Sequence, residues 1–200
     1  MNIIFATGNK GKMREIREIF PEDRYRLLSM GEAGFTGEIE ENGKTFEENA
    51  LIKVRAIGKR PDTVVLSDDS GLLIDAFDGA PGVYSARYLG EDTPYEEKNR
   101  VILERMSGLK EENRTCRYVC VIAALFPDGT EKTVSASMEG RIAFEAKGEG
   151  GFGYDPIFFL PEFKRTAAEL QAFEKNSVSH RGKALRMMAK ELSNWEKTHA

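Results

Sequence analysis

Apolar residues follow two different periods along this chain of 200 residues. A short apolar run over residues 2–7 predicts a strand. The segment after it places Met13, Ile16 and Ile19 on one stripe of a helix, and Pro21 is expected to end that helix. A strand therefore leads directly into an amphipathic helix near the amino terminus.

Two capping boxes predict further helices. Thr45 with Glu48 opens one helix, and Thr93 with Glu96 opens another that reaches about residue 106, with Pro94 at its first helical position. In each box the hydroxyl and the carboxylate are expected to accept hydrogen bonds from backbone amides at the helix start. We interpret both helices as scaffold.

The second half of the chain is richer in strands. Residues 117–126 and 131–139 flank the pair Asp128-Gly129, which is a strong signal for an antiparallel hairpin. A final amphipathic helix is predicted over residues 179–195. The order of these elements predicts an α/β fold with a mixed sheet, in a single domain over residues 1–200 with two lobes.

The bulk composition excludes several classes of protein. With 40% hydrophobic and 31% charged residues, the chain resembles an ordinary soluble domain. No segment approaches the roughly 20 consecutive apolar residues of a membrane helix, and the first residues lack a signal-peptide layout, so we expect a cytoplasmic protein without a membrane partner. The formal net charge of −4 argues against a protein that coats nucleic acid.

The two cysteines, Cys116 and Cys120, lie in one of the predicted strands. Side chains four residues apart in a strand are about 13 Å apart, which is too far for a disulfide or a shared metal ion. Reduced packing thiols are therefore expected.

Two adjacent carboxylates, Asp68 and Asp69, end an apolar run and precede Gly71. We expect the two acids at the end of a strand, where neighbouring side chains point to opposite faces, so one carboxylate could hold a cation while the other handles a proton. The pair suggests chemistry on an anionic substrate, although a solvated acidic turn has the same composition.

The segment Thr7-Gly8-Asn9-Lys10-Gly11-Lys12 connects the first strand to the first helix. Glycines permit close approach of a ligand, free amides at a helix start attract phosphate oxygens, and either lysine adds a charge. The spacing of a Walker phosphate loop is absent, which disfavours a P-loop kinase or ATPase. A tight turn with solvated lysines is the alternative.

Three further segments carry candidate ligand-binding groups. Glu40, between Glu38 and Glu41, is a second carboxylate for a metal near Asp69, or else part of a solvated loop. The glycine-rich segment 148–156 carries an aromatic pair, at positions 152 and 154, suited to a purine ring. Near the last helix, His180 and its neighbours form a set of hydrogen-bond donors, although a lone histidine is often structural.

Taken together, these segments resemble the inosine triphosphate pyrophosphatase family, and the match runs nearly end to end in the same order. The motifs that carry the resemblance are Thr7-Gly8-Asn9 with Lys10 and Lys12, Ser67-Asp68-Asp69-Ser70-Gly71-Leu72, Gly79-Ala80-Pro81-Gly82-Val83-Tyr84-Ser85-Ala86-Arg87-Tyr88, Gly151-Phe152-Gly153-Tyr154-Asp155-Pro156 and Ser179-His180-Arg181-Gly182.

The resemblance implies an elongated mixed sheet flanked by helices, with two lobes, a central active-site cleft and assembly as a homodimer. It implies hydrolysis of ITP, dITP or XTP to the monophosphate and pyrophosphate, with Mg²⁺ as cofactor. Asp69 would be proton acceptor and metal ligand, Glu40 the other metal ligand and Ser70 a substrate contact. The remaining implied substrate-binding residues are Thr7, Gly8, Asn9, Lys10, Gly11 and Lys12 for the triphosphate, and Phe152, Gly153, Tyr154, Asp155, Lys175, His180 and Arg181 for the base and sugar.

Our hypothesis is that Asp69, helped by Asp68 and Mg²⁺, activates a water that attacks the α-phosphorus. Donors such as His180 and Arg181 would select the 6-carbonyl of an oxo-purine over the 6-amino group of adenine. Two alternatives are a Maf-type pyrophosphatase acting on modified nucleotides and a sensor that binds a purine nucleotide without cleaving it.

Overall fold

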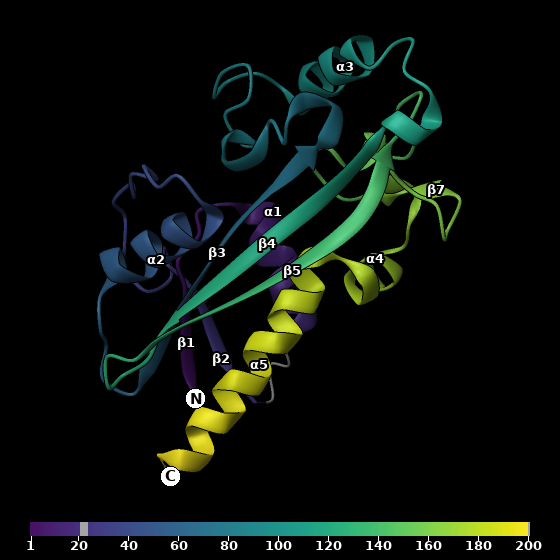
Figure 1. Ribbon diagram of the computed structural model, residues 1–200. Helices are drawn as coiled ribbons and strands as arrows, with labels where there is room; N and C mark the ends of the chain where they lie inside the picture. Colours follow the sequence, from purple (N-terminus) through teal and green to yellow (C-terminus); the bar gives the residue numbers. More distant parts are fainter. Residues whose placement is uncertain (21–23, 200) are drawn as a thin grey trace. The chain divides into compact units, whose positions relative to one another are not determined.

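The structure, a computed structural model, describes residues 1–20 and 24–199 of the chain. Strands and helices alternate over the first half of the chain, whereas the second half has consecutive strands followed by two helices (Figure 1). The elements are β1 (Asn2–Phe5), α1 (Lys10–Ile19), β2 (Arg26–Ser29), α2 (Phe46–Ile57), β3 (Thr63–Ile74), α3 (Tyr95–Arg105), β4 (Thr115–Leu125), β5 (Glu131–Ile142), β6 (Phe158–Leu160), β7 (Arg165–Thr166), α4 (Ala172–Val178) and α5 (His180–Thr198). Short 3-10 turns connect several of them.

The strands form a mixed sheet, which confirms the predicted α/β class. Seven strands of the described residues pair in the order β2-β1-β3-β4-β5-β6-β7. β1 lies parallel to β2 and to β3, whereas β6 lies antiparallel to β5 and to β7. In this order β1 lies between β2 and β3, and both of these strands come after it in the sequence. At such a position in a parallel sheet, ligands commonly bind outside the carboxyl ends of the strands.

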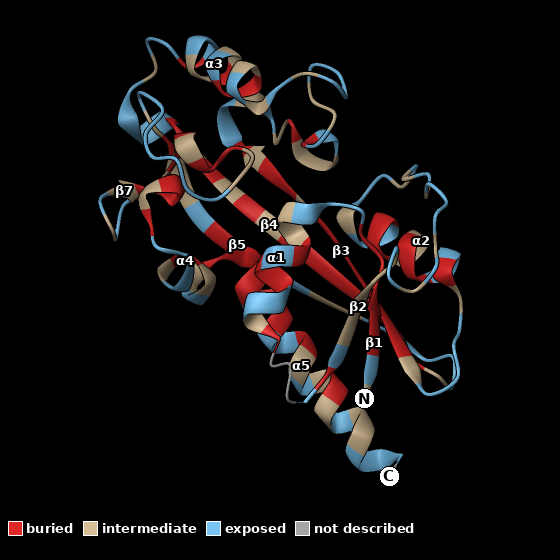
Figure 2. Cartoon of the chain, turned by 180° about the vertical axis from the view of Figure 1, so that it is seen from behind, coloured by how far each residue is buried: buried red, intermediate tan, exposed pale blue. Residues whose placement is uncertain are grey.

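The chain divides into two compact units, which are described separately. The first unit contains Met1–Asp69, Cys120–Ala136 and Arg181–Ala200, and the second contains Ser70–Val119 and Ser137–His180. In the first unit, apolar residues of α1 and α5 pack against one face of the strands, and α2 packs against the other. Figure 2 shows the strands of this region as largely buried.

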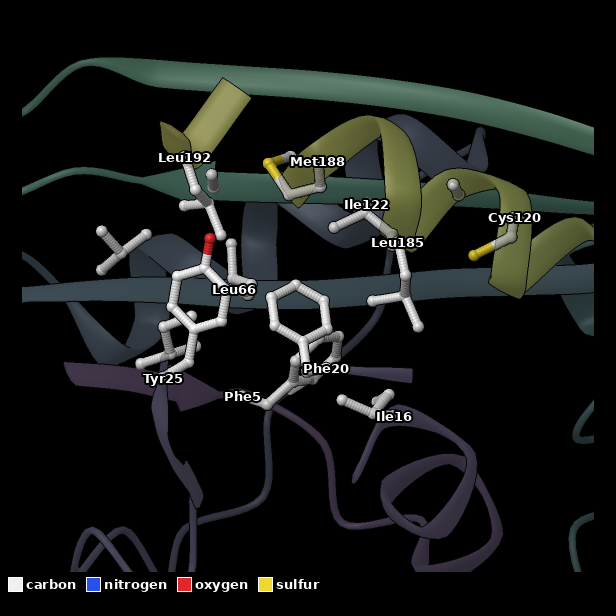
Figure 3. Packing of buried hydrophobic residues seen from close by; sticks show 14 of the residues in the cluster. Phe5, Ile16, Phe20, Tyr25, Leu66, Cys120, Ile122, Leu185, Met188 and Leu192 are labelled. Atoms are coloured by element: carbon white, nitrogen blue, oxygen red, sulfur yellow. The ribbon is translucent and has the colours of Figure 1, made fainter. Parts of the chain in front are cut away.

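The larger core of the first unit is built from alternate strand residues. Phe5 and Leu66 point to the α1 and α5 side, where they meet Ile16, Leu185 and Met188 (Figure 3). The intervening residues of the strands belong to a second cluster beneath α2. Each fully buried side chain of this size contributes about 1.5–3 kcal/mol of hydrophobic free energy. The two clusters therefore stabilise the packing of helices on both faces of the sheet.

The second unit has its own core, in which Tyr118, Tyr154 and Phe158 are the large aromatic members. Tyr118 stacks on Phe158 with ring centroids 4.5 Å apart, and Tyr95 meets the edge of Tyr154 at 5.2 Å. Aromatic pairs of this kind add to the free energy of area burial. These contacts fix the segment that follows the glycine-rich loop.

Most predicted elements are confirmed, including the first helix, the hairpin strands and the final helix. The turn between β4 and β5 forms where Asp128-Gly129 predicts it, with the Phe126 amide donating to the Thr130 carbonyl at 2.9 Å. Cys116 and Cys120 are buried free thiols, as expected. Pro21, expected to end α1, lies outside the described residues.

The capping predictions are only partly right. Thr45 caps α2 by accepting from the Glu48 amide at 3.1 Å, but the Glu48 carboxylate accepts from the Lys44 amide instead of closing the box on Thr45. At α3 the predicted box is wrong, because the Thr93 hydroxyl donates to the Leu89 carbonyl at 2.7 Å and Pro94 takes the cap position. The short helix α4 was not predicted. Within the described residues, no helix combines the length and apolar character needed to span a bilayer.

Candidate active site

Asp68 and Asp69 lie in the middle of β3, so the prediction that they close the strand is wrong. The strand continues because Leu72 and Ile74 resume the buried apolar pattern after the two acids. The predicted alternation of neighbouring side chains between the two faces of the strand is present. Asp68 contacts residues of α1 and α5, and Asp69 contacts residues of α2. The two carboxylates therefore belong to different faces of the sheet.

Asp68 is enclosed by cations within the first unit. Its Oδ2 atom lies 3.1 Å from Lys12 Nζ and accepts from Arg181 Nε at 3.2 Å. Burial alone would raise the pKa of Asp68, but Lys12, Arg181 and Lys53 outweigh burial and hold the pKa well below its usual range. Asp68 therefore stays ionised and acts as the counter-ion that orients these basic side chains.

Arg181 joins this carboxylate to a second one. Its guanidinium is bonded to Glu15 of α1 as well as to Asp68, and all three side chains are buried. Burial opposes the charge, yet the two carboxylates raise the pKa of Arg181 above its usual value. Glu15, Arg181, Asp68 and Lys12 thus form a chain of alternating charges between α1, β3 and α5.

Asp69 has a different environment on the α2 side. Its Oδ2 atom accepts a hydrogen bond of 3.0 Å from Asn49 Nδ2, and its Oδ1 atom lies 3.7 Å from Lys53 Nζ. Burial raises the pKa of Asp69, and the nearby Glu41 raises it further, against the opposing effects of Lys53 and Lys12. Neighbouring acids whose pKa values are shifted in opposite directions are typical of a site in which one residue moves a proton.

The loop that carries Glu38, Glu40 and Glu41 supplies a second carboxylate near Asp69. This carboxylate belongs to Glu41, which shares the neighbour Lys53 with Asp69. Lys53 Nζ lies 2.8 Å from Glu41 Oε2, so its ammonium sits between Glu41 and Asp69. Burial lowers the pKa of Lys53, but Asp69, Asp68 and Glu41 more than compensate and raise it. Glu40, the predicted metal ligand, is exposed. The described part of the chain has no group of three or more His, Cys, Asp or Glu side chains that could hold a metal ion.

The predicted triphosphate loop has an ordered start. Asn9 caps α1 by accepting from the Lys12 amide at 3.0 Å, and the Thr7 hydroxyl accepts from the Asn9 amide at 3.2 Å. A Cβ at Gly8 would meet nothing within 4 Å. Packing therefore does not require glycine at position 8, whereas close approach of a ligand would.

In the second unit, Asp155 organises the glycine-rich segment. Its Oδ2 atom lies 2.6 Å from Lys175 Nζ and accepts from the Phe152 amide at 2.8 Å. Tyr118 donates to the other oxygen at 3.4 Å, and the same Tyr118 ring stacks on His180 with centroids 4.7 Å apart. These contacts gather three of the predicted base-pocket residues, Phe152, Lys175 and (through Tyr118) His180, around the buried carboxylate of a fourth, Asp155.

Packing explains several glycines of this segment. A Cβ at Gly148 would lie 2.5 Å from the Ala168 backbone, and one at Gly151 would lie 2.1 Å from Asp155 Oδ2. The Tyr154 side chain is buried and donates to the Ser85 carbonyl at 2.7 Å. The glycine count therefore does not by itself indicate a ligand, and the Tyr154 ring is part of the core.

Comparison with known proteins adds an independent finding to this geometry. The sequence model of the Ham1 family matches residues 3–191. The chain belongs to the Ham1 family.

Relatives of this Ham1-family chain share most of its length. A protein of Desulforamulus reducens named dITP/XTP pyrophosphatase is 49% identical over 187 residues, which cover 93% of this chain and 92% of the relative. A dITP/XTP pyrophosphatase of Bacillus subtilis is 47% identical over 189 residues, which cover 94% of this chain and 96% of the relative. The solved structure of a HAM1 protein from Coxiella burnetii superposes with a TM-score of 0.86 at 38% identity, over 97% of this chain and 99% of the other. These matches confirm the resemblance seen in the motifs and the α/β fold.

The structure brings together part of each predicted residue set in this Ham1-family chain. Within the first unit it joins Lys12 and Arg181 to Asp68, and within the second it joins Lys175 to Asp155. Lys10 lies at the start of α1, and Ser70 follows Asp69 along β3. The predicted roles of these residues in binding a substrate and a metal stay predictions.

Sequence reasoning missed Asn49, Lys53 and Glu15. A signal existed for Lys53, because it lies on the same face of α2 as the buried Ala50 and Val54, where a lysine needs a charged partner. Asn49 is four residues earlier, so it shares that face. Glu15 gave no comparable signal, since an acid beside the apolar stripe of a surface helix is ordinary.

Proposed function

We propose that this chain hydrolyses ITP, dITP and XTP to the nucleoside monophosphate and pyrophosphate. The observation that carries the proposal is the pair Asp68 and Asp69, whose pKa values are shifted in opposite directions beside Lys12 and Lys53. The names of the relatives from Desulforamulus reducens and Bacillus subtilis support the same activity. The chain is then a nucleoside-triphosphate pyrophosphatase.

In the proposed reaction, Asp69 is the general base. Its oxygen accepts a proton from water while the water oxygen bonds to the α-phosphorus, and the bond from that phosphorus to the oxygen bridging the α- and β-phosphates breaks. Pyrophosphate leaves with the bridging oxygen. A raised pKa makes Asp69 a stronger base than an ordinary carboxylate, and Asn49 holds the orientation of its carboxylate.

The basic residues of the first unit stabilise the charge of the phosphates. Lys12 is fixed by Asp68, and Lys53 is fixed by Glu41, so both ammonium groups are positioned before a substrate binds. Preorganised charges stabilise a transition state without reorganising during the reaction. Arg181 serves here to hold Asp68 in place, because its guanidinium is already bonded to Asp68 and Glu15.

The side chains fit a Mg²⁺ ion. Asp69 Oδ1 and Glu41 Oε2 lie 3.7 Å and 2.8 Å from the same Lys53 Nζ atom, so two hard oxygen donors lie in the same neighbourhood. Mg²⁺ is usually held by one or two carboxylates together with substrate phosphates and water, which is the number of donors available here. Asp69 with Glu41 or Glu40 would hold the ion, and when bound it would neutralise charge on the phosphate oxygens.

We assign recognition of the oxo-purine to the second unit. Lys175 and His180 are donors fixed by Asp155 and Tyr118, and Phe152 lies beside Lys175, whose Nζ is 5.2 Å from the ring centroid. Donors fixed in this way favour a 6-carbonyl and leave the 6-amino group of adenine without an acceptor, which can cost several powers of ten in rate.

A substrate panel tests the proposal. Pyrophosphate release is measured with ITP, XTP, GTP, ATP and dTTP, each with and without Mg²⁺. The proposal predicts release from ITP and XTP that depends on Mg²⁺, with far slower release from ATP. Preferential cleavage of dTTP would favour Maf-type activity, and saturable binding of ITP without pyrophosphate release would favour a sensor.

The expected homodimer is a further part of the proposal. Sedimentation of the purified protein at several concentrations should give the mass of two chains. A mass of one chain throughout the concentration range would contradict it. Binding of the protein to a long duplex DNA at low salt checks the expectation that nucleic acid is not a partner, and no retention is expected because the formal net charge is −4.

A further inference from the structure

Helix α1 presents two different polar faces. Lys12 and Glu15 point to the buried charges around Asp68, as described above. Lys10, Arg14 and Arg17 follow the spacing of the opposite stripe and are exposed. Figure 2 shows that α1 carries both buried and exposed residues. This second face belongs to no part of the proposed mechanism except through Lys10.

A cavity lies against that second face, entirely within the first unit. Its volume is about 710 Å³, and its walls come from the end of β1, the α1 stripe and the segment after β2. Small-molecule sites commonly have volumes of about 300–1,000 Å³. The cavity lies where β1 and β2 end, which is the edge of a parallel sheet that commonly binds ligands. We call it the α1–β2 cavity.

The α1–β2 cavity is lined by three cations, Lys10, Arg14 and Arg17, and by two carboxylates, Glu18 and Glu32, so its net positive charge favours an anion. Arg17 is neutralised by Glu32, whose two oxygens each lie 2.7 Å from its guanidinium, and the Ser29 amide and hydroxyl, followed by Arg17, lower the pKa of Glu32 to about 2. Lys10 and Arg14 have no ion-pair or hydrogen-bond partner for their side chains among residues 1–20 and 24–199. Like charges four residues apart on a helix repel each other, so an anion between them is stabilising.

The rest of the wall favours an apolar group attached to that anion. Met13, Met30 and Phe35 line the cavity together with the cations. Methionine and phenylalanine offer polarizable and flat surfaces to an aromatic ring. Inorganic phosphate alone would leave this wall uncovered, whereas a nucleoside monophosphate matches both the charge and the apolar surface.

We propose that the α1–β2 cavity binds a nucleoside monophosphate, with the phosphate at Lys10 and Arg14 and the base against Met30 and Phe35. The side chains of Met30 and Phe35 offer apolar surface and no hydrogen bond to a base, so the site tolerates adenine as well as oxo-purines. Thr7, Gly8 and Lys10 also belong to the segment assigned to the substrate triphosphate. If the proposed function holds, the occupant therefore regulates that segment from the other face of α1.

AMP is the probe that separates this site from the proposed substrate site, because its 6-amino group is disfavoured in an oxo-purine pocket. Binding of AMP and of inorganic phosphate is measured by equilibrium dialysis on wild type, Arg14→Ala, Phe35→Ala and the matched control Arg26→Ala, an exposed cation of β2 outside the cavity wall. We expect saturable binding of AMP to wild type and to the control. Arg14→Ala should weaken it about tenfold or more, and Phe35→Ala by a smaller factor.

Three results would overturn the inference. They are the absence of saturable AMP binding to wild type, AMP binding that Arg14→Ala leaves unchanged, and inorganic phosphate binding as tightly as AMP with no effect of Phe35→Ala. Pyrophosphate release from ITP is measured on the same preparations and is expected to be retained in Arg14→Ala. Wild type that cleaves ITP without binding AMP refutes only this inference, and wild type that binds AMP at this site without cleaving ITP refutes only the proposed function.

Discussion

The replacement Arg181→Met is the sharpest test of the buried charge network. It removes the guanidinium that Asp68 and Glu15 share while keeping much of the side-chain volume. Both carboxylates are then left in a buried site with one fewer cation. Breaking a buried ion pair from one side costs about 3–5 kcal/mol, so the free energy of unfolding at pH 7 should fall by about that amount. For a chain of this size the midpoint of thermal unfolding should fall by roughly 10 °C.

The pH dependence of this loss has a definite sign. In wild type the pKa of Asp68 is lowered, so its contribution to stability is present above its unfolded pKa of about 4 and is lost as the pH falls. In Arg181→Met, burial has less opposition, and the pKa of Asp68 moves upward. A raised pKa favours folding at low pH and disfavours it as the pH rises. The stability difference between variant and wild type should therefore shrink from pH 7 to pH 4.

Urea unfolding followed by the fluorescence of Trp195 measures both effects. Trp195 stacks on Phe126 in the same unit, with ring centroids 5.3 Å apart, so its emission reports this core. Lys190→Met, an exposed change on α5, is the matched control and should stay within about 0.5 kcal/mol of wild type. Arg181→Met with the stability of this control at pH 7 would refute the reasoning, as would a difference that grows on acidification.

Three more changes test other parts of the account. Asn49→Ala removes a hydrogen bond that lowers the pKa of Asp69, so the acid limb of the pyrophosphatase pH profile should move to higher pH. Lys175→Met leaves a buried carboxylate without its cation and should cost about 3–5 kcal/mol in urea unfolding. Gly151→Ala places a Cβ 2.1 Å from Asp155 Oδ2 at a residue with φ of 70°. The backbone strain alone should lower the free energy of unfolding by about 1–3 kcal/mol, and the clash adds to it.

Two exposed changes are the stability controls. Lys44→Met, at an exposed lysine, is the control for Lys175→Met and should stay within about 0.5 kcal/mol of wild type. Gly37→Ala is the control for Gly151→Ala and should also stay within about 0.5 kcal/mol, because its Cβ would meet nothing within 4 Å. An unchanged acid limb in Asn49→Ala would remove Asn49 from the environment of the proton acceptor. Stabilities equal to the controls for Lys175→Met or Gly151→Ala would contradict the account of the second unit.

Local pattern was sufficient to predict much of the fold. The apolar stripe of α1 and the Asp128-Gly129 turn depend on residues close in sequence, and both are present. Alternation along a strand also predicted that Asp68 and Asp69 face different ways. The predicted end of β3 is too early, because the two acids interrupt the apolar run but Leu72 and Ile74 resume it at buried positions.

The partners in the candidate site could not be predicted in the same way. Arg181 meets Glu15 across 166 positions of sequence, and no local period relates such residues. The acidic loop shows the same limit, because a loop has no period that decides whether Glu40 or Glu41 turns inward. The glycines near residue 150 predict a ligand-binding loop from composition, but the approach of the Ala168 backbone accounts for Gly148.

A single-turnover reaction of ITP in water enriched with oxygen-18, run with wild type and Asp69→Asn, tests the central claim most directly. The account predicts that wild type places the label in IMP and none in pyrophosphate, and that Asp69→Asn remains folded but loses turnover. Label in pyrophosphate, or a near-normal rate in Asp69→Asn, would contradict attack of an Asp69-activated water on the α-phosphorus.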